Sequence, residues 1–442
     1  MKGANVKTVK LSILAGLVAS FFAGTALAQD KTLNMIVIEG GDTTAMQAVV
    51  DAYKASHPGI AINLQSYPFA QFFQVAELRL RSADAGIDLV YVDAPLMASY
   101  ASRGFLSPID PGIDTSSLVP SALDAGKYDG KQYALPINNS AQVMFYNKTL
   151  FEKAGITPPT GLTAGQTSTQ GDVDKLASTE RWTWEQVADA AQKLTVKDGG
   201  RTTTYGFSVE QFAELYQLQP FGESLGTDVI GPDGYTAKGY LDSEAWTKAA
   251  TYWSELYSSG VSPKGLGYGE GAQLFGNGQL AMFAGGTWNL PILAATGVDF
   301  GVAPYPYFAG GKVLTPTGSW YVGVNVASAN QTEAMDFASY LTTNAEGTKV
   351  WFDALQQLPT YKPLLDTIST SADFDVFPKN VFRLGVYDSL NTAKARPVTA
   401  AYGQLQDAFR TAFTDISNGV AVSEALKSAV QKFETAANRV AK

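Results

Sequence analysis

The chain has 442 residues, of which 45% are hydrophobic and 12% aromatic, with 32 basic residues, 41 acidic residues, one histidine and no cysteine. A chain this long exceeds the roughly 250–300 residues at which a single hydrophobic core stops growing, so at least two lobes are expected. The missing cysteines exclude disulfides and thiolate metal sites, and the acidic balance argues against nucleic acid or an anionic membrane as partner, because both need a basic surface.

The N-terminus carries the pattern of a secretory signal peptide. Three lysines precede an apolar run over residues 11–27, which ends in an Ala-Leu-Ala triplet before Gln29. We therefore expect residues 1–28 to be cleaved. A membrane anchor is the less favoured alternative, because the run is shorter than the roughly 20 apolar residues of a membrane span and contains serine and glycine. No cysteine follows to carry a lipid, so we expect a free periplasmic protein of net charge −12, since 29 basic and 41 acidic residues remain.

The segment after the signal alternates strands with helices. Apolar runs at 33–38, 60–67 and 89–92 predict strands, and apolar residues at helical spacing lie between them. This α/β pattern indicates a parallel sheet, whose ligands bind at the carboxyl ends of the strands. The turns at 40–43 and 93–95 are therefore expected to face a ligand.

Further strands and helices are predicted in the remainder of the chain. A capping box from Thr183 to Gln186 predicts the start of a helix. Between Thr157 and Arg181 the composition turns to Thr, Gly, Gln, Ser and Pro, which indicates a surface excursion. Further strands are predicted at 142–146, 280–284, 302–305 and 320–326, and a last helix near the C-terminus.

The composition removes most catalytic mechanisms. A Ser-His-Asp triad would have to use His57, which directly follows an amphipathic helix and is expected to cap that helix or lie on the surface. No phosphate-binding loop, nucleophile elbow or dinucleotide motif occurs. We therefore assign no catalytic residue, no cofactor and no metal. A secreted glycoside-active enzyme remains an alternative, because such an enzyme needs only two carboxylates, and a secreted adhesin is a third class.

Several segments in order carry a family resemblance. Residues 138–155 read Asn-Asn-Ser-Ala-Gln-Val-Met-Phe-Tyr-Asn-Lys-Thr-Leu-Phe-Glu-Lys-Ala-Gly, and residues 275–288 read Phe-Gly-Asn-Gly-Gln-Leu-Ala-Met-Phe-Ala-Gly-Gly-Thr-Trp. With Gly318-Ser-Trp320 and Arg396-Pro397, they resemble the maltose-type family of extracellular solute-binding proteins over essentially the whole mature chain. The departure is a stretch of about twenty residues between the proline pair at 158–159 and Thr183, where members of the family usually pass quickly to the next helix.

The resemblance implies a fold of two α/β lobes whose hinge closes over a ligand cleft. The N-terminal lobe would comprise residues 29–139 and 307–344, and the C-terminal lobe residues 140–306 and 345–442. The implied function is the capture of a carbohydrate and its delivery to the membrane permease subunits of an ABC importer, by a monomer without enzymatic activity. A non-sugar solute such as glycerol phosphate or a polyamine is the alternative ligand. Crossings between the lobes are expected near 139–142, 302–306 and 341–347.

A sugar site needs aromatic platforms for the C–H faces and polar groups for the hydroxyls. Trp288 follows Gly285-Gly286 at a strand end, and the matching family position commonly carries a stacking tryptophan. Trp320 stands after Gly318-Ser319 in a similar context. Trp246 and Trp253 lie seven residues apart on one helical face and are expected in the core.

Polar candidates stand at the predicted strand ends. Asp42 could alternatively cap a helix, and Arg383 could pair with an aspartate for structure. The complete predicted ligand-binding set is Asp42, Thr43, Gln71, Asp93, Asn139, Glu223, Tyr268, Gly286, Trp288, Ser319, Trp320 and Arg383.

Overall fold

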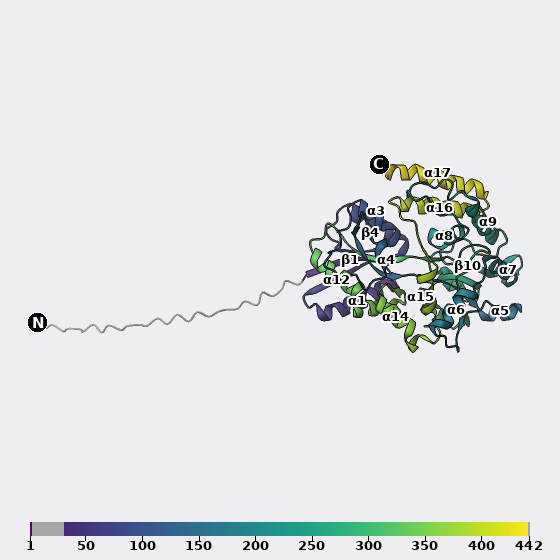
Figure 1. Ribbon diagram of the computed structural model, residues 1–442, viewed down its shortest axis with the longest axis horizontal. Coiled ribbons are helices and arrows are strands. Elements are labelled where there is room, and N and C mark those ends of the chain that lie inside the picture. Colours follow the sequence, from purple (N-terminus) through teal and green to yellow (C-terminus); the bar gives the residue numbers. More distant parts are fainter. Residues whose placement is uncertain (2–30, 441–442) are drawn as a thin grey trace.

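The computed structural model describes residues 31–440 together with Met1, except for the side chain of Ser319, and the predicted signal peptide at 1–28 lies outside this range apart from Met1. Figure 1 shows two lobes side by side. Each lobe is built on a six-stranded sheet of mixed parallel and antiparallel strands, and the predicted α/β class is confirmed. Over residues 31–440 no helix is both long and apolar enough to cross a membrane.

The first lobe has the strand order β15-β6-β14-β3-β1-β2. The first three strands of the chain pair in parallel, and β14 runs antiparallel between β3 and β6. The long apolar side chains of β1 and β3 are buried on both faces of the sheet, which is typical of parallel strands covered by helices. The strands span β1 (Lys31–Ile38), β2 (Ile60–Tyr67), β3 (Leu89–Asp93), β6 (Ala134–Asn139), β14 (Ser319–Val324) and β15 (Leu358–Pro359).

The second lobe has the strand order β8-β12-β7-β11-β10-β9. Here β10 and β11 are parallel, and β7 runs antiparallel between β11 and β12. The strands span β7 (Gln142–Asn147), β8 (Leu162–Thr163), β9 (Val196–Asp198), β10 (Arg201–Val209), β11 (Leu280–Gly286) and β12 (Phe300–Pro304). Two short pairs lie outside these sheets: β4 (Lys127–Tyr128) with β5 (Lys131–Gln132), and β13 (Thr315–Thr317) with β16 (Ala393–Ala395).

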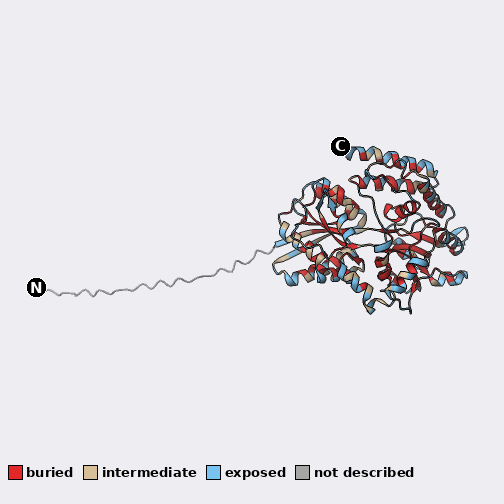
Figure 2. Ribbon diagram, viewed as in Figure 1, coloured by how far each residue is buried: buried red, intermediate tan, exposed pale blue. Residues whose placement is uncertain are grey.

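Helices cover the sheets, and their buried faces form the cores (Figure 2). The predicted capping box is present at the start of α7, and Trp246 and Trp253 on α9 are both 0% exposed, so their core role is confirmed. The helices span α1 (Gly41–Ser56), α2 (Phe69–Arg81), α3 (Met97–Ser102), α4 (Pro120–Ala125), α5 (Lys148–Ala154), α6 (Gln170–Thr179), α7 (Trp184–Leu194), α8 (Leu215–Ser224), α9 (Glu244–Ser258), α10 (Glu270–Gly276), α11 (Leu290–Thr296), α12 (Gln331–Thr343), α13 (Ala345–Leu355), α14 (Lys362–Thr370), α15 (Val381–Asn391), α16 (Tyr402–Ser417) and α17 (Val422–Val440), with short 3-10 turns at Ala94–Leu96, Thr287–Asn289 and Ala372–Phe374.

The lobe boundaries differ from the predicted ones in two places. Helix α13 packs on α1, its Trp351 lies in the first-lobe core, and β15 pairs with β6, so residues 345–359 belong with the first lobe. Phe308 instead packs in the second-lobe core, so the first-lobe segment begins at β14 and not at residue 307. The crossing near 139–142 is confirmed between β6 and β7, whereas the third crossing follows β15 and does not lie at 341–347.

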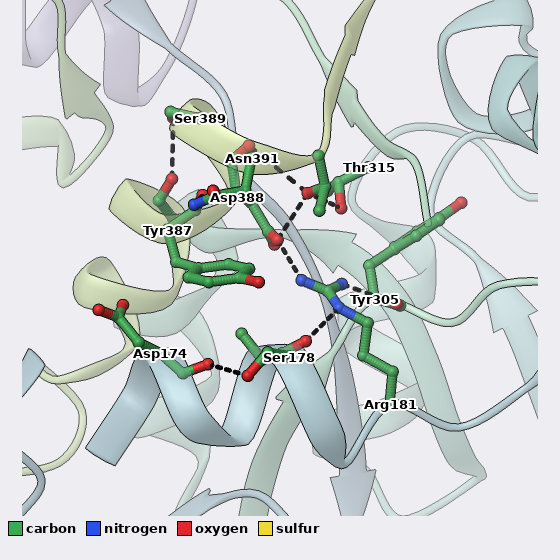
Figure 3. A network of polar contacts seen from close by, with 12 residues as sticks. Asp174, Ser178, Arg181, Tyr305, Thr315, Tyr387, Asp388, Ser389 and Asn391 are labelled. Atoms are coloured by element: carbon green, nitrogen blue, oxygen red, sulfur yellow. Dashed lines mark hydrogen bonds and ion pairs between the residues drawn. The ribbon is translucent and has the colours of Figure 1, made fainter. Parts of the chain in front are cut away.

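The polar excursion before Thr183 is folded onto the second lobe. It contains β8 and α6, which opens with a capping box between Thr169 and Asp172 and packs against α15. Figure 3 shows how its last residues are held: Arg181 forms a buried ion pair with Asp388 and donates to the carbonyl oxygen of Tyr305 at 3.0 Å. The segment that departs from the family pattern therefore ends in a buried ionic contact.

Candidate functional site

A cavity of about 360 Å³ lies between the two lobes. Its first-lobe wall comes from the segments that follow β1, β2 and β3, as predicted for the carboxyl ends of parallel strands. Its second-lobe wall comes from the segments after β10 and β11 and from the loop before α10. The cavity is therefore the interlobe cleft that the sequence predicted.

Two tryptophans, one from each lobe, line this cavity. Trp320 on β14 stacks on Tyr91, with ring centroids 4.4 Å apart and an interplanar angle of 9°. Trp288 follows β11, and its indole Nε1 donates to Oε1 of Glu210 at 2.8 Å. Both rings are only partly buried, so each leaves part of its surface free for a ligand.

Gly286 lies beneath Trp288 and does not itself line the cavity. A Cβ atom added at Gly286 would lie 2.0 Å from the Trp288 ring, so only glycine leaves room for the indole in this position. Gly286 therefore makes room for the indole of Trp288 and does not contribute to the cavity wall, where its ligand contact was predicted.

Asp93 lies at the end of β3, where it lines the cavity and is paired with Arg396. Arg396 donates from Nη1 to Oδ2 of Asp93 at 2.8 Å and from Nη2 to the second oxygen. Its guanidinium also lies 5.0 Å from the ring centroid of Tyr216, which belongs to α8 of the second lobe. The bidentate pair fixes both side chains and compensates their charges.

Asp42 also lines the cavity, at the start of α1. Its Oδ1 accepts from the hydroxyl of Tyr91 at 3.0 Å, and the N-cap position of α1 is occupied by Gly40 and not by Asp42. Burial raises the pKa of Asp42 to about 6, although the Tyr91 hydrogen bond works in the opposite direction. The structure therefore favours the cleft role over the alternative of a helix cap.

Tyr268 reaches across the cleft from the second lobe. Its ring stacks on Phe69 of α2, with centroids 5.1 Å apart and planes at 14°. Both rings line the 360 Å³ cavity and also a neighbouring cavity of about 960 Å³, which extends toward α16. The stacked pair therefore stands between two chambers of the interlobe space.

Besides Gly286, three further predicted residues that the structure describes, Thr43, Gln71 and Asn139, do not line the cavity. Thr43 donates to the carbonyl oxygen of Ile38 at 2.6 Å, and Gln71 lies exposed on α2. Asn139 lies in β6 at the crossing, and its backbone pairs with β14 and β15. Ser319 lies in β14, but its side chain is outside the described part of the structure.

Glu223 and Arg383 do not line the cavity, so the prediction that they contact the ligand there is wrong. Glu223 is buried on α8, where it accepts from Gln219 at 2.9 Å and lies 3.6 Å from Lys394, and burial raises its pKa to about 7. Arg383 is 1% exposed on α15, and its guanidinium pairs with Asp375. The remaining Arg383 donors are taken by main-chain carbonyl groups of Ile368, Ser168 and Ser371.

The alternative raised for Arg383, pairing with an aspartate for structure, is the one observed. His57 is the C-cap of α1, as expected, and stacks on Tyr53 with ring centroids 3.9 Å apart.

Several residues in the cleft wall and directly behind it could not be predicted from the sequence. Gln211 lines the cavity and Glu210 lies buried directly behind its wall, and both follow β10, a strand that the sequence pattern does not predict. Arg396 stood inside a recognised motif, but its partner Asp93 is 303 residues away in sequence and no local pattern joins them. The other lining residues outside the predicted set and outside the predicted turn at 40–43 are Ile38, Glu39, Pro68, Phe69, Ser140, Tyr216, Ile292, Gly318, Leu355 and Gln357.

Comparison with known proteins identifies the class. The model of the bacterial extracellular solute-binding protein family matches residues 39–348, so the chain belongs to that family. The chain is 25% identical to the mannitol-binding protein of Pseudomonas aeruginosa over 367 residues, covering 77% of this chain and 75% of that protein. It is 24% identical to a binding protein of Brucella abortus over 267 residues and spans 58% of that protein's length.

A solved structure supports the fold. An ABC substrate-binding protein from Listeria monocytogenes in complex with cycloalternan superposes with a TM-score of 0.76 at 24% identity, covering 91% of this chain and 97% of that one. This likeness demonstrates the two-lobed fold of the solute-binding proteins.

Proposed function

We propose that this protein captures a carbohydrate in the interlobe cleft and delivers it to the permease subunits of an ABC importer. The observation that carries the proposal is the pair of tryptophans, Trp288 and Trp320, which line one cavity from the two lobes beside carboxylates and amides. Aromatic faces pack against the C–H groups of a sugar ring, while carboxylates and amides accept and donate hydrogen bonds to its hydroxyls.

The charges of the cavity support a neutral ligand. Among the described residues that line it, the single cation is Arg396, and both of its terminal nitrogens already donate to Asp93. A phosphate group would need unpaired cations or free backbone N–H groups, and at the start of α1, where such N–H groups line the cavity, the carboxyl group of Asp42 is already present. Glycerol phosphate is therefore the weaker candidate, while a polyamine would have to pair with Asp42 or Glu39.

A thermal-shift screen tests this proposal. The mature protein, with residues 1–28 removed, is heated alone and with mannitol, maltose, maltotriose, glycerol 3-phosphate or spermidine. A ligand bound only by the native state stabilises it by RT ln(1 + [L]/Kd). We expect saturable shifts with one or more of the neutral sugars or polyols. A shift confined to glycerol 3-phosphate or spermidine would contradict the carbohydrate assignment, and a flat screen would favour an adhesin.

Binding without turnover separates this function from that of a glycoside-active enzyme. We expect the sugar identified by the screen to be recovered chemically unchanged after prolonged incubation, as judged by mass analysis. Enzyme-dependent product formation would contradict the proposal.

The proposed location is the periplasm, which the N-terminal signal pattern and the family both support. We also propose that the protein works as a monomer. Cell fractionation, followed by light scattering of the mature protein, tests both statements, and retention in the cytoplasm or a stable oligomer would contradict them.

A further inference from the structure

Glu210 is a fully buried carboxylate directly behind the second-lobe wall of the cleft. It follows the last residue of β10, and its own backbone N–H donates to the carbonyl oxygen of Ala284 on β11 at 2.9 Å. Its side chain is 0% exposed and does not line the cavity. The position is therefore rigid and inaccessible to ligand.

Three N–H groups converge on this carboxylate. Oε1 accepts from the indole Nε1 of Trp288 at 2.8 Å and from Nδ2 of Asn289 at 3.0 Å, and Oε2 accepts from the backbone N–H of Gly286 at 3.1 Å. All three donors come from the turn that carries Trp288 out of β11. An ionised carboxylate only accepts hydrogen bonds and can serve all three donors. A protonated carboxyl group carries an O–H hydrogen of its own, which competes with these donors.

Within the described part of the chain no ion pair to Glu210 is formed, and the titratable groups that sense its charge are the hydroxyls of Tyr216 on α8 and of Tyr268 before α10. Burial keeps the pKa of both hydroxyls above their ordinary value, so they stay neutral near pH 7. Burial likewise raises the pKa of Glu210 to about 7, against the lowering effect of its three hydrogen bonds.

We propose that Glu210 is a positioning residue, which fixes Trp288 as a wall of the cleft while its carboxylate is ionised and releases the indole when it is protonated. Ligand capture would then be strongest above neutral pH. The consequence for binding rests on the proposed carbohydrate function, but the effect on Trp288 does not.

The central test follows Trp288 in the ligand-free protein. The indole N–H resonance of Trp288 is assigned by its absence in Trp288→Phe and is followed from pH 8.5 to pH 5.5 in wild type and in Glu210→Gln. We expect one transition near pH 7 in the wild-type resonance, together with faster exchange with water at the acidic end. In Glu210→Gln, which cannot ionise, the resonance should stay constant over the same range.

Trp320→Phe is the matched control, because Trp320 lines the same cavity without contacting Glu210. It should leave the Trp288 transition in place. A wild-type Trp288 resonance that does not change between pH 8.5 and pH 5.5 would overturn the proposal even if Glu210→Gln failed to fold. A transition that persists in Glu210→Gln would assign the effect to another group, with Asp42 and its pKa of about 6 as the first candidate.

Calorimetry with mannitol and with maltose tests the consequence for binding. With a pKa of about 7 for Glu210, the ionised fraction falls about tenfold between pH 8 and pH 6, and the apparent affinity falls with the competent fraction. We expect this tenfold loss in wild type and its absence in Glu210→Gln. Equal pH dependence in both proteins would overturn the link to binding. If neither probe binds, the carbohydrate proposal fails for those sugars, while the resonance experiment still decides the role of Glu210.

Discussion

At the scale of single residues, the tryptophans have two different roles: some line the ligand cleft and others pack in the hydrophobic core. Trp288 lines the cleft, so Trp288→Ala should weaken ligand binding by roughly 2–4 kcal/mol, as expected for a central aromatic anchor. Trp246 is 0% exposed, so Trp246→Ala should instead reduce the free energy of unfolding by about 3–5 kcal/mol. Calorimetry and urea denaturation of both variants separate the two effects. Equal destabilisation by the two substitutions, with affinity intact in Trp288→Ala, would make Trp288 a packing residue.

Buried carboxyl groups give the folded protein an unusual pH dependence. Burial raises the pKa of Glu210 and Glu223 to about 7 and that of Asp42 to about 6. Between pH 5.5 and pH 8 the folded state therefore holds more protons than the unfolded state, and stability falls as pH rises. Urea denaturation should show a larger free energy of unfolding at pH 5.5 than at pH 8, with about 2 kcal/mol of the difference coming from Glu210. A difference of the same size in Glu210→Gln would contradict this assignment.

At the scale of secondary-structure elements, α6 and the segment after it are held by long-range contacts. Arg181 and Asp388 form a buried pair, so Arg181→Met leaves a carboxyl without its cation and should reduce the free energy of unfolding by about 3–5 kcal/mol. The matched control is Lys193→Met, which removes the exposed partner of Asp189 on α7 and should change stability little. Urea denaturation compares the two, and equal losses would mean that the buried pair has no special role.

The same elements show what the sequence could predict. The parallel strands of the first lobe were predictable from apolar runs, and with them the cleft positions of Asp42 and Asp93 at strand ends. The folding of α6 was not, because its composition is polar and its contacts come from α15, about 200 residues later in the chain. The contacts of Glu210 with Trp288 and of Arg396 with Asp93 could not be predicted for the same reason, because each joins segments that are distant in the sequence.

At the scale of the whole molecule, the lobes touch across the cleft through Phe69 and Tyr268. Because this stack joins the two lobes, Tyr268→Ala should shift the ligand-free protein toward forms in which the lobes lie farther apart. Small-angle scattering should then give a larger radius of gyration than in wild type. Tyr128→Ala, which removes an exposed ring outside the cleft, is the control and should leave the radius unchanged. An unchanged radius in Tyr268→Ala would mean that the stack does not hold the lobes together.

A crystal structure of the mature protein, grown with the sugar found in the screen, tests directly whether a sugar is held between the two lobes. We expect ligand density in the 360 Å³ cavity, in contact with the rings of both Trp288 and Trp320. Density at any other place, or a sugar that touches neither ring, would contradict it.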